Sequence, residues 1–306
     1  MEDLYDVIII GAGAAGLTAG IYSSRARLST LILNEGVVGG QMVLTNEIAN
    51  YPGVELTHGY ALAGIMKKQA REFGAKIKSN VKIEKYELDG EIKRIILEDG
   101  RAFKSRSVIL APGGKPRPLN IPGEKTFKGS GISYCATCDG DFFTNKEVIV
   151  VGGGNSALEE AVALTAYVKK VTIVHQFDHF QAFQHAIDEA SKNPKIDFIM
   201  ESELRTFSGN GSLEEVSLEH LPSGNYSHLK INGVFVFVGY IPNTSILQNI
   251  IALNERQEII VDENMMTNIP GVFAAGDCIV KRYRQVTTAV ADGTIASLSA
   301  AEYLRS

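Results

Sequence analysis

The order of apolar and polar residues at the start of the chain predicts a strand, a tight turn, a helix and a second strand. Asp6–Ile10 is a short run rich in β-branched apolar residues, which is typical of a central parallel strand. Gly11–Gly16 then reads Gly-Ala-Gly-Ala-Ala-Gly, and apolar residues at helical spacing follow over Leu17–Arg27, before the apolar run Thr30–Leu33. This order is the beginning of a βαβ unit with a dinucleotide-type glycine turn.

The same order returns in the middle of the chain. The expected strand is Glu147–Val151, the glycine turn is Gly152–Ala157, the helix is Leu158–Tyr167, and the next strand is Val171–Val174. One glycine fingerprint is a weak signal, but two of them, each after a strand and before a helix, are a strong one. We therefore predict an α/β protein with two Rossmann-like, dinucleotide-binding domains.

Composition and charge narrow the class of protein. The 306 residues are long for one domain and comfortable for two, and 45% hydrophobic and 21% charged residues are ordinary for a folded chain. The net charge of −5 argues against broad nucleic-acid binding. No apolar run approaches the roughly 18 residues that would cross a membrane, and the start of the chain lacks the basic residues of a signal peptide. We expect neither a nucleic acid nor a membrane as partner.

The three cysteines, Cys135, Cys138 and Cys278, indicate redox chemistry more than a scaffold of disulfides. Three are too few for a secreted disulfide framework, so a reducing, cytoplasmic setting fits better. Cys135 and Cys138 form a C-x-x-C pair that can cycle between dithiol and disulfide, and Asp139 follows at once. A zinc site would need a second pair or nearby histidines, so we predict no metal site. Cys278 is expected to be a small buried residue.

Several motifs together resemble the low-molecular-weight thioredoxin reductases over essentially the whole chain. The resemblance is carried by Gly11–Gly16, Gly39–Gln41, Tyr51–Gly53, Cys135–Gly140, Gly152–Ala157, Gly271–Asp277 and Tyr283–Gln285, of which Cys-Ala-Thr-Cys-Asp-Gly is the most specific. It implies an FAD-dependent homodimer that reduces the disulfide of thioredoxin. In this family NADPH ordinarily supplies the electrons and is bound by the second glycine motif.

The resemblance also predicts how the two domains are assembled from the chain. Thr267–Asp277 is expected to be a strand ending in Gly276 and Asp277, which brings an aspartate to the sugar-like chain of the flavin. We therefore predict an FAD-binding domain built from residues 1–114 and 243–306. Residues 115–242 form an inserted redox-disulfide domain with a degenerate NAD(P)H-binding-like fold. Glycines at both crossings between the domains would suit a hinge.

The first glycine turn is the predicted FAD site. A helix N-terminus and its glycines can hold a pyrophosphate, and Glu35 is placed to accept a hydrogen bond from a ribose hydroxyl. As alternatives, Glu35 is a solvated strand end and Asn50 a turn former. Taken together, the turn and the resemblance imply these FAD-binding residues: Gly11, Gly13, Ala14, Ala15, Gly16, Glu35, Gly40, Gln41, Asn50, Val81, Ala111, Gly113, Gly276, Asp277, Arg284, Gln285 and Val286.

The second glycine turn lacks the residues that hold a nicotinamide dinucleotide phosphate. NADPH-using relatives carry His-Arg-Arg-x-x-x-Arg after the second strand, whereas this chain has Gln176, Phe177 and Gln181 at the three arginine positions. Each charge-assisted hydrogen bond is worth about 1.5–3 kcal/mol, so NADPH binding should be weakened by orders of magnitude. An NADH site would need an acid at Gln176, although Asp178 could reach a ribose hydroxyl. Close helix–strand packing explains why the glycines are kept.

Without a nicotinamide donor, electrons must arrive by another route. The absence of the three arginines resembles the pyridine-nucleotide-independent, ferredoxin-dependent flavin thioredoxin reductases, so reduced ferredoxin is the predicted electron donor. A ferredoxin is usually acidic, and Lys281–Arg284 is the densest basic cluster near the predicted flavin contacts, although a solvated loop would explain it equally well. Two alternatives remain open. One is an NAD(P)H-dependent thioredoxin reductase with an atypical clamp, meaning that residues other than the three arginines hold the nucleotide. The other is a non-catalytic flavin redox sensor.

The resemblance assigns a role to each residue of the redox motif. Cys138 is the flavin-proximal sulfur, and Cys135 is the thiol that attacks the disulfide of thioredoxin. The mixed disulfide is then resolved by the partner's second thiol or by Cys138. Asp139 is placed to move the proton as general acid and base, and a helix or turn cap is its structural alternative.

Overall fold

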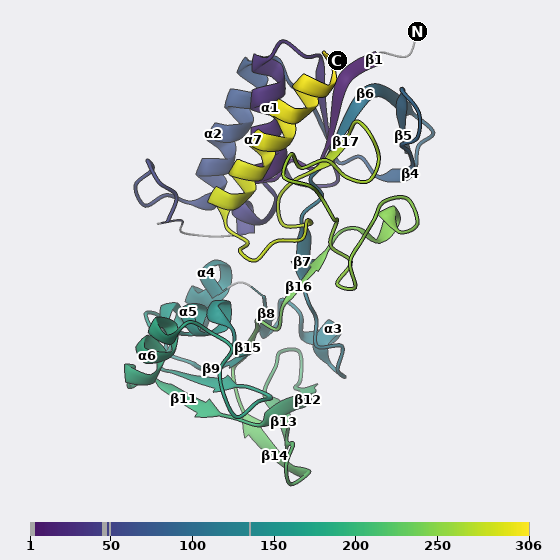
Figure 1. Cartoon of the computed structure of the whole chain (residues 1–306). Coiled ribbons are helices and arrows are strands. Elements are labelled where there is room, and N and C mark those ends of the chain that lie inside the picture. Colours follow the sequence, from purple (N-terminus) through teal and green to yellow (C-terminus); the bar gives the residue numbers. More distant parts are fainter. Residues whose placement is uncertain (1–3, 45–47, 49, 135, 306) are drawn as a thin grey trace. The chain divides into compact units, whose positions relative to one another are not determined.

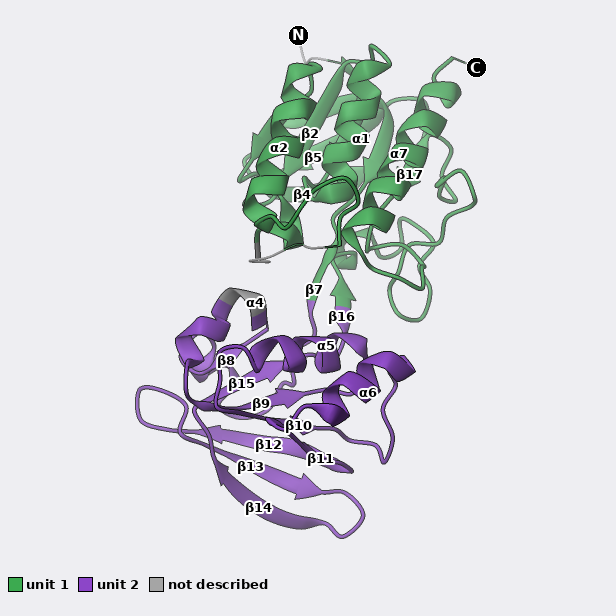
Figure 2. Cartoon of the chain, turned by 90° about the vertical axis from the view of Figure 1, so that its left-hand side faces the viewer, with its two compact units in different colours: residues 1–115, 241–306 green, residues 116–240 purple. Residues whose placement is uncertain are grey.

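The computed structural model of the protein describes residues 4–44, 48, 50–134 and 136–305. Its chain divides into two compact units, coloured separately in Figure 2. Unit 1 comprises Met1–Lys115 and Ile241–Ser306, and unit 2 comprises Pro116–Tyr240. Unit 1 therefore takes both ends of the chain. The chain passes between the units through β7 (Gly114–Pro116) and β16 (Tyr240–Pro242), which pair with each other as a two-stranded sheet (Figure 1).

Unit 1 is a seven-stranded sheet with helices on one face. The strands run in the order β3-β2-β1-β6-β5-β4, with β17 also paired to β6. β1, β2, β3, β6 and β17 are mutually parallel, whereas β4 and β5 are antiparallel additions. The bounds are β1 (Leu4–Ile10), α1 (Ala14–Arg25), β2 (Thr30–Asn34), η1 (Gly40–Leu44), α2 (Gly59–Glu72), β3 (Lys76–Ser79), β4 (Ile83–Glu87), β5 (Lys93–Leu97), β6 (Ala102–Leu110), η3 (Ser245–Leu247), β17 (Val272–Ala274) and α7 (Val286–Tyr303).

The central strand β1 is apolar throughout because both of its faces are buried. Val7 and Ile9 pack into the core under α1, α2 and α7, while Ile8 and Ile10 pack into the core on the opposite face. Alternate side chains of a strand point to opposite faces, so a strand covered on both sides reads as a continuous apolar run. The helices pack closely: a Cβ built at Gly293 of α7 would lie 2.2 Å from the carbonyl oxygen of Ala15 in α1.

Unit 2 has a five-stranded parallel sheet in the order β11-β10-β9-β15-β8. Val148 and Val150 of β9 pack against helices α5 and α6, whereas Ile149 and Val151 pack toward an antiparallel sheet of β12, β13 and β14. The bounds are α3 (Glu124–Phe127), β8 (Ile132–Ser133), α4 (Ala136–Asp139), η2 (Gly140–Phe143), β9 (Glu147–Val151), α5 (Asn155–Leu164), β10 (Lys170–Val174), α6 (Gln184–Lys192), β11 (Ile196–Ile199), β12 (Ser202–Ser208), β13 (Glu215–His220), β14 (Asn225–Lys230) and β15 (Gly233–Val236).

The elements differ from the sequence predictions mainly at their ends. α1 and α5 each begin three residues before the predicted leucine, because the small residues after the glycines already belong to the first helical turn. The strand predicted over Thr267–Asp277 is only Val272–Ala274, since Gly271 before it has a left-handed φ of 74°. In the part of the chain that the structure describes, none of the helices has the length and apolar character needed to cross a membrane.

Candidate functional site

The predicted FAD-site residues of unit 1 follow the carboxyl ends of parallel strands. β1 leads into Gly11, β2 into Glu35, β6 into Ala111, and β17 into Gly276 and Asp277. Val81 follows β3 and donates its N–H to Asn34 O at 3.2 Å. The carboxyl ends of parallel strands meet at one edge of a sheet, and ligands of open α/β sheets bind there. The fold thus brings together residues that are far apart in the sequence.

The first glycine turn needs glycine at its first position. Gly11 has a φ of 101°, and a Cβ built there would lie 2.1 Å from Ala111 O. A side chain at this residue would be strained and would also clash with the backbone after β6. The turn is held by the N–H of Gly11 on Leu33 O at 2.8 Å and by the N–H of Ala12 on Asn34 Oδ1 at 2.9 Å. Asn34 is a residue that the sequence analysis missed.

The loop after β2 closes over this turn. The N–H of Gly39 donates to Ala12 O at 2.8 Å, and a Cβ built at Gly40 would lie 3.0 Å from Gly13 Cα. Glu35 is exposed beside the turn. The first residues of α1, Ala14, Ala15 and Gly16, are buried under it, so backbone N–H groups at this helix N-terminus form the polar surface.

Asp277 carries a buried oxygen that has no partner. Its Oδ1 is shielded from solvent and makes no hydrogen bond within the described residues. Burial raises the pKa of Asp277, whereas the charges of Lys281 and Arg284 oppose that rise. An unpaired buried carboxylate oxygen is costly unless a ligand donor satisfies it. A sugar-like hydroxyl would do so, and together with the glycine turn this makes the site a fit for FAD.

Other predicted contacts of the flavin lie near the same edge. Gln41 Nε2 donates to Gly114 O at 3.0 Å, and Asn50 Nδ2 donates to Gln285 Oε1 at 3.1 Å. Gln285 caps α7, which begins at Val286. Gly113 has a φ of 60°, and its carbonyl oxygen accepts the N–H of Asn243 at 2.9 Å.

The basic cluster Lys281–Arg284 is largely neutralised inside unit 1. Lys281 forms a largely buried ion pair with Asp292 of α7, and the partly buried Arg284 forms an ion pair with Glu258. Arg284 also donates to Asp277 O at 3.3 Å, while Arg282 lies over the ring of Tyr283 at 5.2 Å. The expectation of a free basic docking patch is corrected here, because two of its three cations have internal acid partners that are distant in sequence.

The second glycine turn in unit 2 keeps the backbone geometry of the first. Gly152 has a φ of 136°, and a Cβ built there would lie 2.3 Å from Phe237 O. Its N–H donates to Val174 O at 3.0 Å, and the N–H of Gln181 donates to Gly153 O at 2.7 Å. The following loop is fastened further by the N–H of Phe183 on Asn155 Oδ1 at 2.7 Å.

The side chains around the second turn are aromatic rings and histidines. His175 is buried with its ring over Gly153, stacks on Phe180 at 5.8 Å and meets the edge of Phe177 at 5.3 Å. Burial lowers the pKa of His175. Asp178, the one acid that could have reached a ribose, contacts His179 Nδ1 at 2.6 Å. Residues 175–185 contain no lysine or arginine.

β8 ends at Ser133, just before the redox motif, and this end of β8 lies at the same edge of the parallel sheet as the second glycine turn. Cys135 lies outside the described residues, as do the side chains of Thr137 and Cys138. Asp139 ends α4, makes no cap hydrogen bond, and instead accepts from Ser133 Oγ at 2.5 Å. Among the residues that the structure describes, the cap proposed as its structural alternative is not formed.

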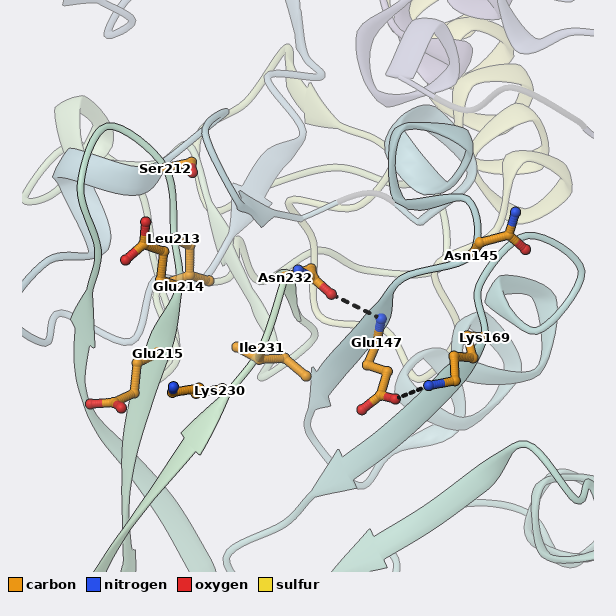
Figure 3. A pocket seen from close by; sticks show the side chains of 10 residues that line it. All are labelled: Asn145, Glu147, Lys169, Ser212, Leu213, Glu214, Glu215, Lys230, Ile231 and Asn232. Carbon is orange, nitrogen blue, oxygen red and sulfur yellow. Dashed lines mark hydrogen bonds and ion pairs between the residues drawn. The ribbon is translucent and has the colours of Figure 1, made fainter.

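Two further features fall outside the site. Buried Cys278 is free, and burial raises the pKa of its thiol to about 12. A pocket in unit 2 lies at the amino end of β9, opposite Gly152, where Glu147 pairs with Lys169 at 2.7 Å and binds Asn232 Oδ1 through its N–H at 3.2 Å (Figure 3). Within the described ranges, no group of three or more His, Cys, Asp or Glu residues is arranged to hold a metal ion.

Comparison with known proteins identifies the family. The pyridine nucleotide-disulphide oxidoreductase family matches residues 5–293. A thioredoxin reductase of Peptoclostridium acidaminophilum is 46% identical over 99% of this chain and 98% of its own length. A protein of Clostridium pasteurianum, described as the 34.2 kDa protein in rubredoxin operon, is 44% identical over 99% and 98%.

A solved structure agrees with these sequence matches. The crystal structure of Lactococcus lactis thioredoxin reductase is 40% identical and superposes with a TM-score of 0.91, covering 98% of this chain and 99% of that one. The chain therefore belongs to the pyridine nucleotide-disulphide oxidoreductases and, within them, to the thioredoxin reductases, which are FAD flavoproteins.

Proposed function

We propose that this protein reduces thioredoxin through Cys135 and Cys138, with electrons that come from reduced ferredoxin. The observation that carries the choice of donor is the second glycine turn, where Gln176, Phe177 and Gln181 replace the arginines of NADPH-using relatives. All three side chains are exposed, and none carries a charge. A 2′-phosphate brought to this loop would therefore lose its hydration without gaining a cation.

The relatives support the acceptor more directly than the donor. The names of the two thioredoxin reductases specify no electron donor. The Clostridium pasteurianum relative is named for its place in a rubredoxin operon, and this name specifies no electron donor either.

The chain's own residues perform a dithiol–disulfide exchange. FAD, when bound, supplies the two-electron reduction of the Cys135–Cys138 disulfide, which takes up two protons to become a dithiol. The Cys135 thiolate then attacks one sulfur of the thioredoxin disulfide and displaces the other as a thiolate. Cys138 attacks the sulfur of Cys135 in this mixed disulfide, which releases dithiol thioredoxin and restores the starting disulfide.

Asp139 serves this exchange as the group that moves the proton. An attacking thiol must lose its proton, and the departing thiolate must gain one, so a carboxyl beside the pair can accept and return it. Asp139 follows Cys138 directly and is partly buried. Unit 1 binds FAD through the residues named above, and two copies of the chain form a homodimer in the cytoplasm.

One observation favours a second candidate, an NAD(P)H-dependent thioredoxin reductase. The backbone of the second turn matches that of the first in its left-handed first glycine and in the hydrogen bond that closes its loop. A dinucleotide could use this backbone if the clamp came from other residues.

Anaerobic reduction of the FAD-loaded protein tests the donor. Oxidised protein is mixed separately with NADPH, NADH and reduced ferredoxin while the flavin absorbance band is followed. We expect prompt bleaching with ferredoxin alone. Saturable reduction by micromolar NADPH or NADH would overturn the choice of donor and select the second candidate.

Thioredoxin is then added to the reduced protein to test the acceptor. Cys138→Ser is the matched control, because it should keep the flavin reducible while abolishing turnover of thioredoxin. A wild-type protein that is fully reduced but turns over no thioredoxin would instead be a redox sensor, the third reading of the sequence.

A further inference from the structure

Ser133 links the two ends of the redox motif. Its Oγ donates to Asp139 Oδ2 at 2.5 Å, and these residues stand on either side of the segment that contains both cysteines. Hydrogen bonds from a hydroxyl to an ionised oxygen have lengths of about 2.5–2.7 Å and are among the strong ones in proteins. The contact fixes one oxygen of the Asp139 carboxylate and so restricts the rotation of the whole group.

Ser133 can act as a fixed point because the sheet holds it. It is only 5% exposed and is the last residue of β8, where it pairs with Phe235 of β15. Phe235 is completely buried. A hydroxyl mounted on a buried strand is more precisely placed than one on a loop.

The residue between Ser133 and Cys135 is anchored as well. Tyr134 donates its hydroxyl to Glu124 Oε1 at 2.6 Å. The buried Glu124 carboxylate also accepts the N–H of Leu119 at 2.8 Å and that of Asn120 at 2.6 Å. The strand side of the motif is thus anchored by buried hydrogen bonds, and Ser133 ties the Asp139 carboxylate to that side.

We propose that Ser133 is the positioning residue of Asp139, and that its hydroxyl holds the carboxylate where it exchanges protons with the cysteine pair. This assignment rests on the proposed role of Asp139. A carboxylate that is free to rotate spends less time in the orientation needed for proton transfer, so loss of the hydroxyl slows that step.

The test uses single-turnover oxidation of the dithiol protein by disulfide thioredoxin over a range of pH. We expect Asp139→Asn to slow the reaction about 100-fold, which is the low end of the effect of losing an acid–base group. The same variant should flatten the pH dependence of the rate. Ser133→Ala should slow the reaction about tenfold and change the same part of the pH profile that Asp139→Asn changes. Ser133→Thr should keep most of the wild-type rate because it retains the hydroxyl. In the Asp139→Asn background, Ser133→Ala should have no further effect.

Matched variants separate positioning from folding. Ser217→Ala removes an equally buried hydroxyl that bonds Thr206 Oγ1 at 2.6 Å in the antiparallel sheet of the same unit, and it should leave the profile unchanged. If the alanine variant is poorly folded, Ser133→Val can be compared with Ser133→Thr. These two side chains have the same shape and differ only in the hydroxyl, so the rate difference between them measures its effect. Alkylation of each cysteine by iodoacetamide against pH gives a readout that needs no flavin turnover.

The outcomes are distinguishable. A Ser133→Ala profile equal to wild type, or an equal slowing in the Asp139→Asn background, overturns the positioning role while leaving the proposed function intact. An unchanged profile in Asp139→Asn removes the assigned role of Asp139 and the inference with it. Unaltered turnover of thioredoxin in that variant would still support the reductase activity.

Discussion

The two glycine turns of this protein share their backbone and differ in their side chains. Both begin with a left-handed glycine, Gly11 or Gly152, whose missing Cβ makes room for the carbonyl oxygen of the residue that follows a neighbouring strand. In both, the N–H of that glycine binds the end of the second strand, and the following loop returns to the turn through one backbone hydrogen bond. The backbone geometry that the two turns share is what a strand–turn–helix connection needs in order to fold.

The side chains that would meet a ligand have diverged. In unit 1 the second strand ends at Asn34, Glu35 follows it, and the next loop contains the three glycines Gly36, Gly39 and Gly40. In unit 2 the corresponding positions are His175 and Gln176, and the loop carries stacked rings. The comparison teaches that a glycine fingerprint reports a folding requirement, whereas ligand choice is set by the residues around it.

The largest expected effect comes from the first position of each turn. Gly11→Ala should abolish FAD binding, because the new Cβ would clash with Ala111 O and displace the turn. Gly152→Ala introduces the same strain of about 1–3 kcal/mol in unit 2 and should leave the flavin in place. The ratio of flavin to protein absorbance measures both. Loss of FAD in Gly152→Ala would contradict the assignment of FAD to the first turn alone.

Placing arginines at the three positions that carry them in NADPH-using relatives should give the second-largest effect, a gain in NADPH affinity. The triple variant Gln176→Arg, Phe177→Arg and Gln181→Arg supplies two or three charge-assisted hydrogen bonds at exposed positions. At about 2 kcal/mol for each of two bonds, NADPH binding should tighten roughly 1000-fold, as measured by calorimetry.

NADH is the control ligand for this variant, because it lacks the 2′-phosphate and should gain little. Equal tightening for both nucleotides would mean that the new arginines act on the pyrophosphate, and the comparison of the two turns would need another explanation.

The helices that follow the two turns differ in charge, and this difference predicts a smaller effect, on the pH dependence of stability. α1 contains no acid, whereas α5 carries Glu159 and Glu160. Burial, with a contribution from Glu159, raises the pKa of Glu160 to about 7, and its Oε2 has no hydrogen-bond partner among the residues described. Because the folded pKa is the higher one, the fold favours the neutral acid, and stability from this group falls as pH rises from about 4.5 through 7.

Glu160→Gln should therefore stabilise unit 2 at pH 8 by about 2 kcal/mol and change little at pH 4. Urea denaturation at the two pH values measures the difference. Glu159→Gln is the control, because this residue is exposed and its own loss should shift stability much less. A gain for Glu160→Gln that is the same at both pH values would show that the carboxyl does not titrate as described.

Local sequence was sufficient for the elements around each turn. The strand Glu147–Val151 was predicted to the residue, because a buried parallel strand reads as an apolar run and a glycine turn marks its end. The helix starts were placed three residues late, since Ala14–Gly16 and Asn155–Ala157 contain few large apolar residues from which a period can be read. The strand before Asp277 was predicted too long for the opposite reason: apolar residues continue beyond the paired segment.

The pairing of charged and polar groups was decided by the tertiary structure. The cluster Lys281–Arg284 looks like a free basic patch in the sequence, but its acid partners Glu258 and Asp292 reach it only through the fold. In the same way, the sequence left Asp139 as either a proton-transfer group or a cap, and only the fold placed Ser133 beside it. A strand or a turn depends on neighbouring residues and can be read from the chain, whereas an ion pair or a positioned carboxylate depends on which elements pack together.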